Sequence, residues 1–257
     1  MPELLFKELE KLPQVEAVAL GGSRAGESCD EKSDYDVYVY CTEPPSEAIR
    51  GKILSAYCSK TEIGNHFWEY EDNCTLKSGV DIDIIYRNLD SFSEEISSVA
   101  DKHIPRGGYT TCMLHNLLTC KIIFDRSGRL AELKKRYSVP YPAELKKNIT
   151  EYNMKLLKYA MPAYDGQIKK AVSRGDKVSV NHRVTEFLAS YFDVIFAVNE
   201  MTHPGEKRLI DICVKRCGIL PADFEENLNS LFSHMFTETE KVPCDIDKIV
   251  SELEKII

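Results

Sequence analysis

The β-strand signal of this chain ends near Pro140, and that change of pattern constrains the possible fold more than any other feature. Ahead of it, short apolar runs rich in Val, Ile and Tyr alternate with segments of helical periodicity, which indicates an α/β or α+β layer. Strands are expected at residues 15–20, 34–41, 62–70, 79–87 and 121–125. Helices are expected at residues 4–12, 46–60, 88–103 and 109–120.

Only helical periodicity continues after Pro140. Helices are expected at residues 143–160, 177–201, 206–217, 222–236 and 245–257, with prolines between several of them. We therefore predict two domains. Residues 1–139 would form a mixed β-sheet with flanking helices, and residues 140–257 would form a C-terminal helical bundle.

Composition limits the kinds of protein this chain can be. A formal net charge of −8 argues against a nucleic-acid binder, because such proteins usually carry a net basic surface. An acidic balance suits cationic small molecules, although it is also common in proteins without such a partner. No apolar run approaches the roughly 18 residues of a membrane helix, and no basic segment leads into an apolar one at the N-terminus. We therefore expect a cytoplasmic protein without a membrane partner.

Cysteine spacing bears on a possible zinc site. The chain has 9 cysteines without a CxxC pair, and Cys112, His115 and Cys120 fall within one segment. Three candidate ligands without the loop of a zinc finger favour core packing of reduced thiols over metal binding.

The segment Gly21-Gly22-Ser23 stands where an expected strand must turn. Two glycines let the backbone approach a ligand closely and expose N–H groups, and Ser23 adds a hydroxyl donor, which together suit a phosphate. A tight turn without a ligand is the alternative. The segment is neither a Walker loop nor a dinucleotide fingerprint, because Gly-Lys-Ser/Thr and a third glycine in register are missing.

Asp34 and Asp36 lie two residues apart at the start of an expected strand, so their side chains project from the same face. Two carboxylates on one face repel each other unless a cation neutralises them. Magnesium does so while keeping positions open for phosphates and water. A solvent-facing strand end is the alternative.

Asp81 and Asp83 repeat this spacing within Val80-Asp81-Ile82-Asp83-Ile84-Ile85. A strand this apolar is expected inside a sheet, where an unpaired carboxylate is costly, so such an acid needs a metal, a cation or an edge position. Three carboxylates from two neighbouring strands suit two magnesium ions, which activate an attacking hydroxyl and stabilise a leaving pyrophosphate.

These separated segments together resemble a known family. The Gly21-Gly22-Ser23 turn, the segment Ser33-Asp34-Tyr35-Asp36-Val37 and a later strand with Asp83 resemble the DNA polymerase β-type nucleotidyltransferase superfamily. Its pattern is a Gly-Gly/Ser turn, an Asp-x-Asp pair and a third acid on an apolar strand. The details are most similar to the small bacterial branch with aminoglycoside and lincosamide nucleotidyltransferases. The motifs cover about residues 15–87, and the helical half matches only in general character.

The resemblance implies transfer of a nucleoside monophosphate, usually AMP from ATP, to an acceptor hydroxyl with release of pyrophosphate. Asp34, Asp36 and Asp83 would ligate two Mg²⁺ ions, and Asp83 would help to deprotonate the acceptor. Asp81 is the alternative third ligand. The phosphates of ATP or another NTP would contact Gly21, Gly22, Ser23 and Arg24, although Arg24 also suits an exposed structural role.

The helical half carries two weaker candidates. The resemblance implies an extra carboxylate as general base, and Glu186 is our choice on the helix expected at residues 177–201. A solvated helix face is the alternative for Glu186. Lys207 stands in a segment that resembles one where a lysine approaches the triphosphate.

The segment Gly64-Asn65-His66-Phe67-Trp68-Glu69 holds the only tryptophan of the chain. We expect a packed aromatic cluster at the sheet edge, and an aromatic and acidic rim that contacts the acceptor is the alternative.

Our leading hypothesis is an Mg²⁺-dependent enzyme that modifies a small hydroxylated acceptor, with antibiotics as one possible class and nucleic acid not expected. A homodimer would agree with relatives that dimerise. Two rivals stay open: an enzyme of the same fold that adenylylates a protein, and a nucleotide-binding module without turnover.

Overall fold

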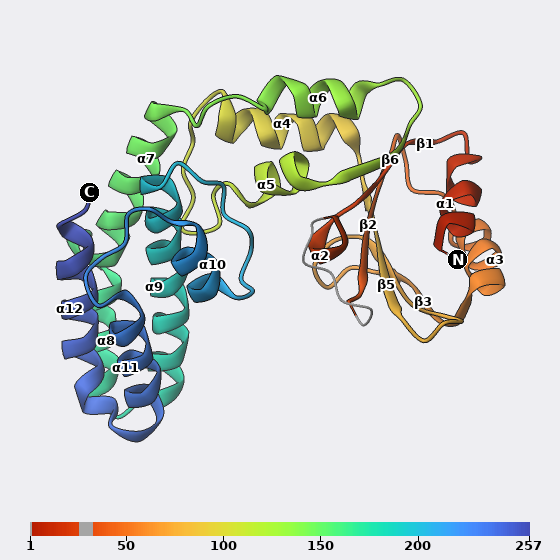
Figure 1. Ribbon diagram of the computed structural model, residues 1–257. Coiled ribbons are helices and arrows are strands. Elements are labelled where there is room, and N and C mark those ends of the chain that lie inside the picture. The colour runs from red at the N-terminus through yellow and green to blue at the C-terminus, as the bar shows by residue number, and fades with distance from the viewer. Residues whose placement is uncertain (1, 26–32) are drawn as a thin grey trace. The chain divides into compact units, whose positions relative to one another are not determined.

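The computed structural model describes residues 2–25 and 33–257, apart from the side chain of Ser23 (Figure 1). The chain forms two compact units. The first unit contains Met1–Ser97 and Asn116–Val139, and the second contains Ser98–His115 and Pro140–Ile257. The second unit therefore includes residues 98–115, which we had assigned to the first domain on the pattern of the sequence.

The first unit is built on a six-stranded sheet with the strand order β3-β4-β5-β2-β1-β6. Strands β2 and β5 are parallel, and every other neighbouring pair is antiparallel. The predicted mixed sheet is therefore confirmed. The strands are β1 (Val15–Leu20), β2 (Tyr35–Cys41), β3 (Cys58–Asn65), β4 (Glu71–Leu76), β5 (Asp81–Arg87) and β6 (Lys121–Asp125).

One face of this sheet forms the core of the first unit. Alternate residues such as Val37, Val39, Ile82 and Ile84 are fully buried there, as expected from the two-residue period of a strand. Helices α1 (Pro2–Glu10) and α3 (Glu47–Tyr57) contribute apolar side chains to the same core and contact β1 and β3 (Figure 1). The opposite alternation forms a second face, where Asp36 of β2 and Asp83 of β5 lie with the polar side chains of β3 and β4, whereas Tyr38 and Tyr40 further along β2 are buried.

A buried ion pair lies within this core. The Arg50 guanidinium of α3 donates to Asp72 Oδ1 of β4 at 2.5 Å, and both side chains are fully buried. Asp72 also accepts hydrogen bonds from the Tyr86 hydroxyl at 3.0 Å and the Gly64 backbone N–H at 2.9 Å. These donors compensate the cost of burying the carboxylate, so the pair ties α3 to three strands.

Helix α6 (Arg129–Tyr137) also belongs to the first unit, whereas α4 (Leu89–Ala100) and α5 (Cys112–Thr119) each include residues of both units. Phe92 of α4 packs on the Tyr40 ring of β2 with 5.2 Å between centroids. Arg129 at the start of α6 pairs with Asp90 of α4 and Glu16 of β1. The four-residue helix α2 (Gly22–Ala25) follows β1 directly.

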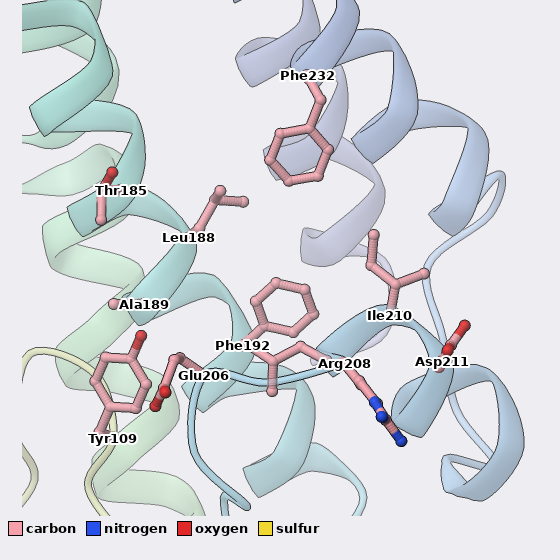
Figure 2. Close-up of a pocket in the computed structure, with 11 residues that line it drawn as sticks. Tyr109, Thr185, Leu188, Ala189, Phe192, Glu206, Arg208, Ile210, Asp211 and Phe232 are labelled. Carbon is pink, nitrogen blue, oxygen red and sulfur yellow. The ribbon is translucent and has the colours of Figure 1, made fainter. Parts of the chain in front are cut away.

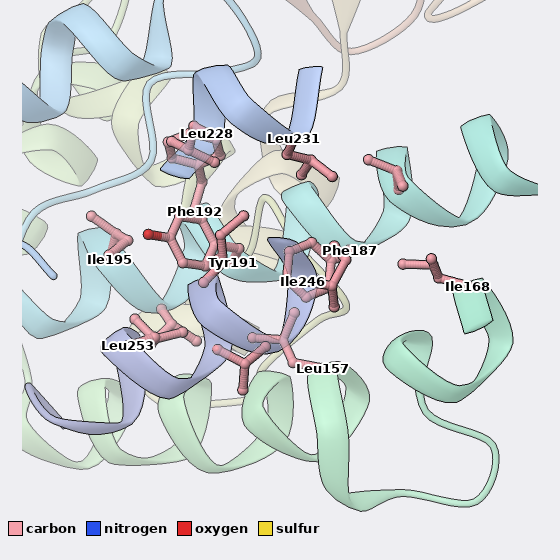
Figure 3. Packing of buried hydrophobic residues seen from close by; sticks show 14 of the residues in the cluster. Leu157, Ile168, Phe187, Tyr191, Phe192, Ile195, Leu228, Leu231, Ile246 and Leu253 are labelled. Carbon is pink, nitrogen blue, oxygen red and sulfur yellow. The ribbon is translucent and has the colours of Figure 1, made fainter. Parts of the chain in front are cut away.

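The second unit is helical, which confirms the predicted C-terminal bundle. Helix α9 (Lys177–Val198) is the longest, and its residues from Ala189 to Val198 are all buried. Figure 3 shows Phe187, Tyr191 and Ile195 of α9 packed among side chains of the neighbouring helices. Those helices are α7 (Ala143–Met154), followed by a π-helical turn (Lys155–Tyr159), α8 (Tyr164–Ser173), α10 (Leu209–Arg216), α11 (Phe224–Thr237) and α12 (Val242–Glu254).

Several elements were not predicted from the sequence, among them strand β4 and helices α2, α6 and α8. Strand β4 reads Glu71-Asp72-Asn73-Cys74-Thr75-Leu76, and its polar side chains hide the alternation of a half-buried strand. Helix α6 follows the Ser127-Gly128 turn and α8 follows Pro162, so both were mistaken for connections. Within the described residues, no helix is long and apolar enough to cross a membrane.

Candidate active site

The central carboxylates lie on the polar face of the first unit's sheet, on its two parallel strands. Asp36 of β2 pairs in register with Asp83 of β5, so the two side chains project side by side. Both are half-buried, whereas Asp34, just ahead of β2, and Asp81, at the start of β5, are exposed. The Asp83 carboxylate therefore lies further inside the sheet than that of Asp81.

A row of amides continues from Asp83 across two more strands. Asn73 of β4 pairs in register with Asp83, and its Nδ2 donates to Asp83 Oδ1 at 2.7 Å. Asn65 Nδ2 of β3 donates in turn to Asn73 Oδ1 at 2.6 Å. This chain of donors orients one carboxylate oxygen of Asp83 and leaves the other oxygen outside that row. Asp81 has its own partner, because the Thr75 hydroxyl donates to its Oδ1 at 2.7 Å.

Side chains of β2 leave no room for a Cβ atom at Gly21 or Gly22. A Cβ at Gly22 would lie 1.8 Å from Asp36 Oδ2, and Gly22 has a φ of +56°, which disfavours other residues. A Cβ at Gly21 would lie 2.4 Å from the Tyr38 ring. The Gly21 N–H donates to the Asp36 carbonyl oxygen at 2.8 Å. The turn and the Asp36 carboxylate are therefore in direct contact, as a shared site for phosphate and metal requires.

The polar face is hollowed beside these residues. A depression of about 420 Å³ is lined by side chains from β3, β4, β5 and the start of β2, including Lys60, Glu62, Asn73, Asp34 and Asp83. Glu71 lies on the same side of β4 as Asn73, and burial raises its pKa, with the Asp83 and Glu69 charges raising it further. The face therefore concentrates negative charge, which favours a cation.

The donor set suits magnesium in its chemistry. Oxygen atoms of half-exposed carboxylates, with one of them oriented by an amide, are hard ligands of the type that Mg²⁺ prefers. Within the described part of the chain, no three His, Cys, Asp or Glu side chains converge as a complete metal site. The structure thus brings together Asp36 and Asp83 as a pair, with Asp34 at the rim of the same depression.

Two family models match the sequence. Residues 3–105 match the family described as a nucleotidyltransferase domain, and residues 109–209 match a domain of unknown function, DUF4037. The nucleotidyltransferase match spans the part of the chain that carries β1 to β5. The predicted superfamily is confirmed by this match, which covers the glycine turn and all four aspartates discussed above. No curated protein matches the chain significantly.

Solved structures give a coarser likeness. A nucleotidyltransferase-like protein from Exiguobacterium sibiricum is 12% identical, with 100% of this chain and 74% of that chain covered and a TM-score of 0.45. An aminoglycoside 6-adenyltransferase from Bacillus subtilis is 9% identical, with 100% and 89% covered and a TM-score of 0.30. The Thermotoga maritima CCA-adding enzyme complexed with tRNA is 11% identical, with 99% and 79% covered and a TM-score of 0.32.

Ser23 and Arg24, which follow Gly22 directly, are two of the residues that we predict to contact a phosphate. The side chain of Ser23 lies outside the described residues. Arg24 Nε donates to the Ser33 carbonyl oxygen at 2.6 Å, and the guanidinium lies 3.8 Å from the Tyr35 ring centroid. These contacts place Arg24 beside the start of β2, and its contact with a phosphate stays a prediction.

The aromatic segment ahead of β4 differs from our expectation. We predicted a packed cluster, but Trp68 is 90% exposed and Phe67 is 78% exposed. Only His66 is stacked, on Tyr70, with 4.5 Å between centroids. The prediction of packing was wrong because residues 66–68 lie at the tip of the β3–β4 hairpin, where the sheet offers no surface to cover them.

The other predicted site residues belong to the second unit and are placed within it. Glu186 is half-buried on α9, and Lys207 is exposed in the turn ahead of α10. The Cys112, His115 and Cys120 segment forms no metal site among the described residues. Cys120, which belongs to the first unit, is buried, and His115 Nδ1 of the second unit lies 2.8 Å from the Thr202 hydroxyl.

Sequence reasoning missed Asn73 and Glu71, although both lie on the face that carries Asp83. Neither residue belongs to a motif. The strand that pairs with β5 could have been used to find them, because its side chains lie directly across from Asp83 and are expected to be polar there.

Proposed function

We propose that this protein transfers a nucleoside monophosphate, AMP from ATP, to a hydroxyl group of a small acceptor. The single observation that carries the proposal is the pair Asp36 and Asp83, side by side on parallel strands, with Asp36 in contact with the Gly21-Gly22 turn. The match of residues 3–105 to the nucleotidyltransferase domain supports the same reaction class.

The reaction balances as a single displacement. The acceptor hydroxyl oxygen forms a bond to the α-phosphorus of ATP, and the bond from that phosphorus to the bridging oxygen breaks. Pyrophosphate leaves, and the hydroxyl proton passes to a carboxylate. Asp83 is our candidate for that carboxylate in the first unit, and Glu186 stays a candidate base from the second unit. Alignment of acceptor and phosphate supplies much of the rate in transfers of this type.

Magnesium fits this proposal through Asp34, Asp36 and Asp83 as ligands of two ions. When bound, the ions would neutralise charge on the phosphates and lower the pKa of the acceptor hydroxyl. Asn73 holds Asp83 in one orientation through its hydrogen bond, and Gly22 leaves room for the Asp36 carboxylate. The residues proposed to contact the nucleotide are Gly21, Gly22, Ser23, Arg24 and Lys207.

A labelling experiment tests the proposal. The protein is incubated with Mg²⁺, each of the four α-labelled NTPs, and a panel of aminoglycosides, lincosamides and cellular proteins. We expect label from ATP on a small hydroxylated acceptor. Asp36→Asn and Asp83→Asn should each lower the rate by about a hundredfold or more, because loss of a metal ligand costs several kcal/mol. Asp81→Asn, a matched change on the same strand, should keep the rate within about threefold.

Three other results would each contradict one part of the proposal. Full activity in Asp83→Asn would overturn the metal assignment. Label on a protein would favour adenylylation of a protein, and nucleotide binding without transfer across the panel would favour a binding module.

A further inference from the structure

The second unit contains a pocket that the reaction chemistry above does not use. It has a volume of about 360 Å³ and lies between α9, α10 and α11 (Figure 2). Leu188 and Phe192 of α9, Ile210 of α10 and Phe232 of α11 form apolar walls. This volume and lining are typical of sites for small organic molecules. Phe232 stays 37% exposed, so one aromatic wall is available to a ligand from solvent.

Charged groups stand at both ends of these apolar walls. Figure 2 shows Tyr109 and Glu206 at one end and Arg208 and Asp211 at the other. The charged side chains of the lining are two carboxylates and one guanidinium, so the net charge of the lining is negative. Burial raises the pKa of the Tyr109 hydroxyl, and the charges of Glu206 and Glu186 raise it further. The end of the pocket at Tyr109 thus favours a positively charged group.

The wall at Tyr109 is held firmly against α9. Thr110 donates to the buried Asp193 carboxylate through its backbone N–H at 3.0 Å and its hydroxyl at 2.6 Å. The His203 backbone N–H donates to the Thr111 hydroxyl at 2.8 Å, and the His203 ring meets the Tyr109 ring edge-on at 4.8 Å. Gly108 approaches α9 so closely that a Cβ would lie 2.7 Å from Ala189 Cβ.

Backbone strain coincides with this pocket. Tyr109 has a φ of 55° and Arg208 a φ of 57°, in the left-handed region that non-glycine residues rarely adopt. Such conformations persist where surrounding contacts hold them and are common at ligand sites. The backbone at Tyr109 is therefore placed before any ligand arrives, which lowers the entropic cost of binding at that wall.

We propose that this pocket binds a small amphipathic amine, with an apolar ring body against Phe192 and Phe232 and a protonated amino group near Tyr109 and Glu206. As a binding site the inference stands without the transfer reaction. As the acceptor class of that reaction it rests on the proposed function.

Matched fragments test the charge preference of the pocket. The full chain is titrated with 1-naphthylmethylamine, 1-naphthalenemethanol and 1-naphthoic acid, which share one ring body, and binding is followed by ligand-observed NMR. We expect the amine to bind with a Kd near the millimolar range, the alcohol about threefold more weakly, and the acid about tenfold more weakly or worse. Equal binding of all three, or none at millimolar concentration, would overturn the proposal.

Variants test the location. Phe232→Ala should weaken amine binding about fivefold or more, as for a buried aromatic contact, whereas Phe236→Ala should leave it unchanged. Phe236 is 72% exposed on the same helix and lies outside the pocket, so it is the matched control. Thr185→Trp fills the pocket from an exposed position without removing core contacts and should also abolish binding.

The charge is tested separately from the walls. Glu206→Gln should lower the preference for the amine over the alcohol, and Glu225→Gln, an exposed glutamate of α11, should not. If either control variant matches its test variant, the pocket is not the site. Amine binding should be unchanged in Asp83→Asn, because Asp83 lies outside the pocket. If the natural protein binds the amine but transfers no nucleotide, the proposed function is overturned and the pocket is not.

Discussion

Asn73 shows how a residue outside any motif shapes the chemistry of the sheet face. Its amide donates to Asp83 and accepts from Asn65, so its own orientation is determined on both sides. Partners that orient a metal ligand commonly contribute nearly as much as the ligand, because they limit its rotation and direct its lone pairs. Asn73 is therefore a positioning residue in the proposed reaction.

Replacing Asn73 tests this positioning role. We predict that Asn73→Ala lowers nucleotidyl transfer about 10- to 100-fold and raises the Mg²⁺ concentration needed for half-maximal rate. Thr75→Ala is the matched control, since it removes the equivalent hydrogen bond to the exposed Asp81 on the same strand pair. The measurement is the initial rate against Mg²⁺ concentration. Equal losses in both variants would show that Asn73 acts only on the stability of the sheet.

Gly22 is also required by a single contact, the one with the Asp36 carboxylate. The sequence suggested close approach of a ligand, and the structure shows that the Asp36 carboxylate already approaches it. Both requirements exclude a side chain, so the glycine serves the fold and the proposed site together.

Helix α9 is the element on which the second unit depends. Its C-terminal half is buried on all sides, which explains why apolar residues appear there without helical periodicity. Asp193 is the one acidic residue in that stretch. Burial raises its pKa from 3.8 to about 6, although Thr110 and Asn153 donate hydrogen bonds to it and lower the pKa in part.

This pKa predicts a pH dependence for the unfolding of the second unit. A folded pKa above the unfolded one means that the folded state binds the proton more tightly, so stability falls as pH rises from about 4 to about 6. Asp193→Asn should remove this fall. The free energy of unfolding of the natural protein should therefore drop relative to Asp193→Asn by up to about 3 kcal/mol over that range and stay level above about pH 7.

Denaturant titrations across this pH range measure the difference. Glu225→Gln, which changes an exposed acid on α11, serves as control and should track the natural protein. A constant difference between Asp193→Asn and the natural protein at all pH values would contradict the raised pKa.

The whole molecule is not a simple series of two domains. The chain leaves the first unit after Ser97, contributes Ser98–His115 to the second unit, returns for Asn116–Val139, and then completes the second unit. A single cut therefore cannot separate the two units. The segment that crosses includes Thr110 and Thr111, which hydrogen-bond to Asp193 and His203 inside the helical unit.

Fragments of the chain test this arrangement. We predict that a fragment of residues 140–257 melts at a lower temperature than a fragment of residues 98–257, or does not fold. The shorter fragment leaves the buried Asp193 without both donors from Thr110, and each lost partner of a buried group costs about 1–3 kcal/mol. Circular dichroism melting curves of the two fragments make the comparison. Equal melting temperatures would show that residues 98–115 are dispensable for the helical unit.

The sequence by itself determined the class of the fold and the chemistry of its sheet face. Val15–Leu20 and Lys121–Asp125 form strands over the residues expected, because short apolar runs bounded by turn residues leave the chain few alternatives. The two Asp-x-Asp pairs indicated a cationic ligand, since carboxylates beside isoleucines are costly without one. These inferences depend only on local pattern.

Tertiary structure decided which residues meet. The pairing of Asp36 with Asp83 depends on the parallel neighbours β2 and β5, and the role of Asn73 depends on a polar strand that has no distinctive pattern of its own. The assignment of residues 98–115 to the helical unit depends on hydrogen bonds to residues more than 80 positions away. Such long-range pairings are set by packing and sheet register, and a local sequence pattern carries no information about them.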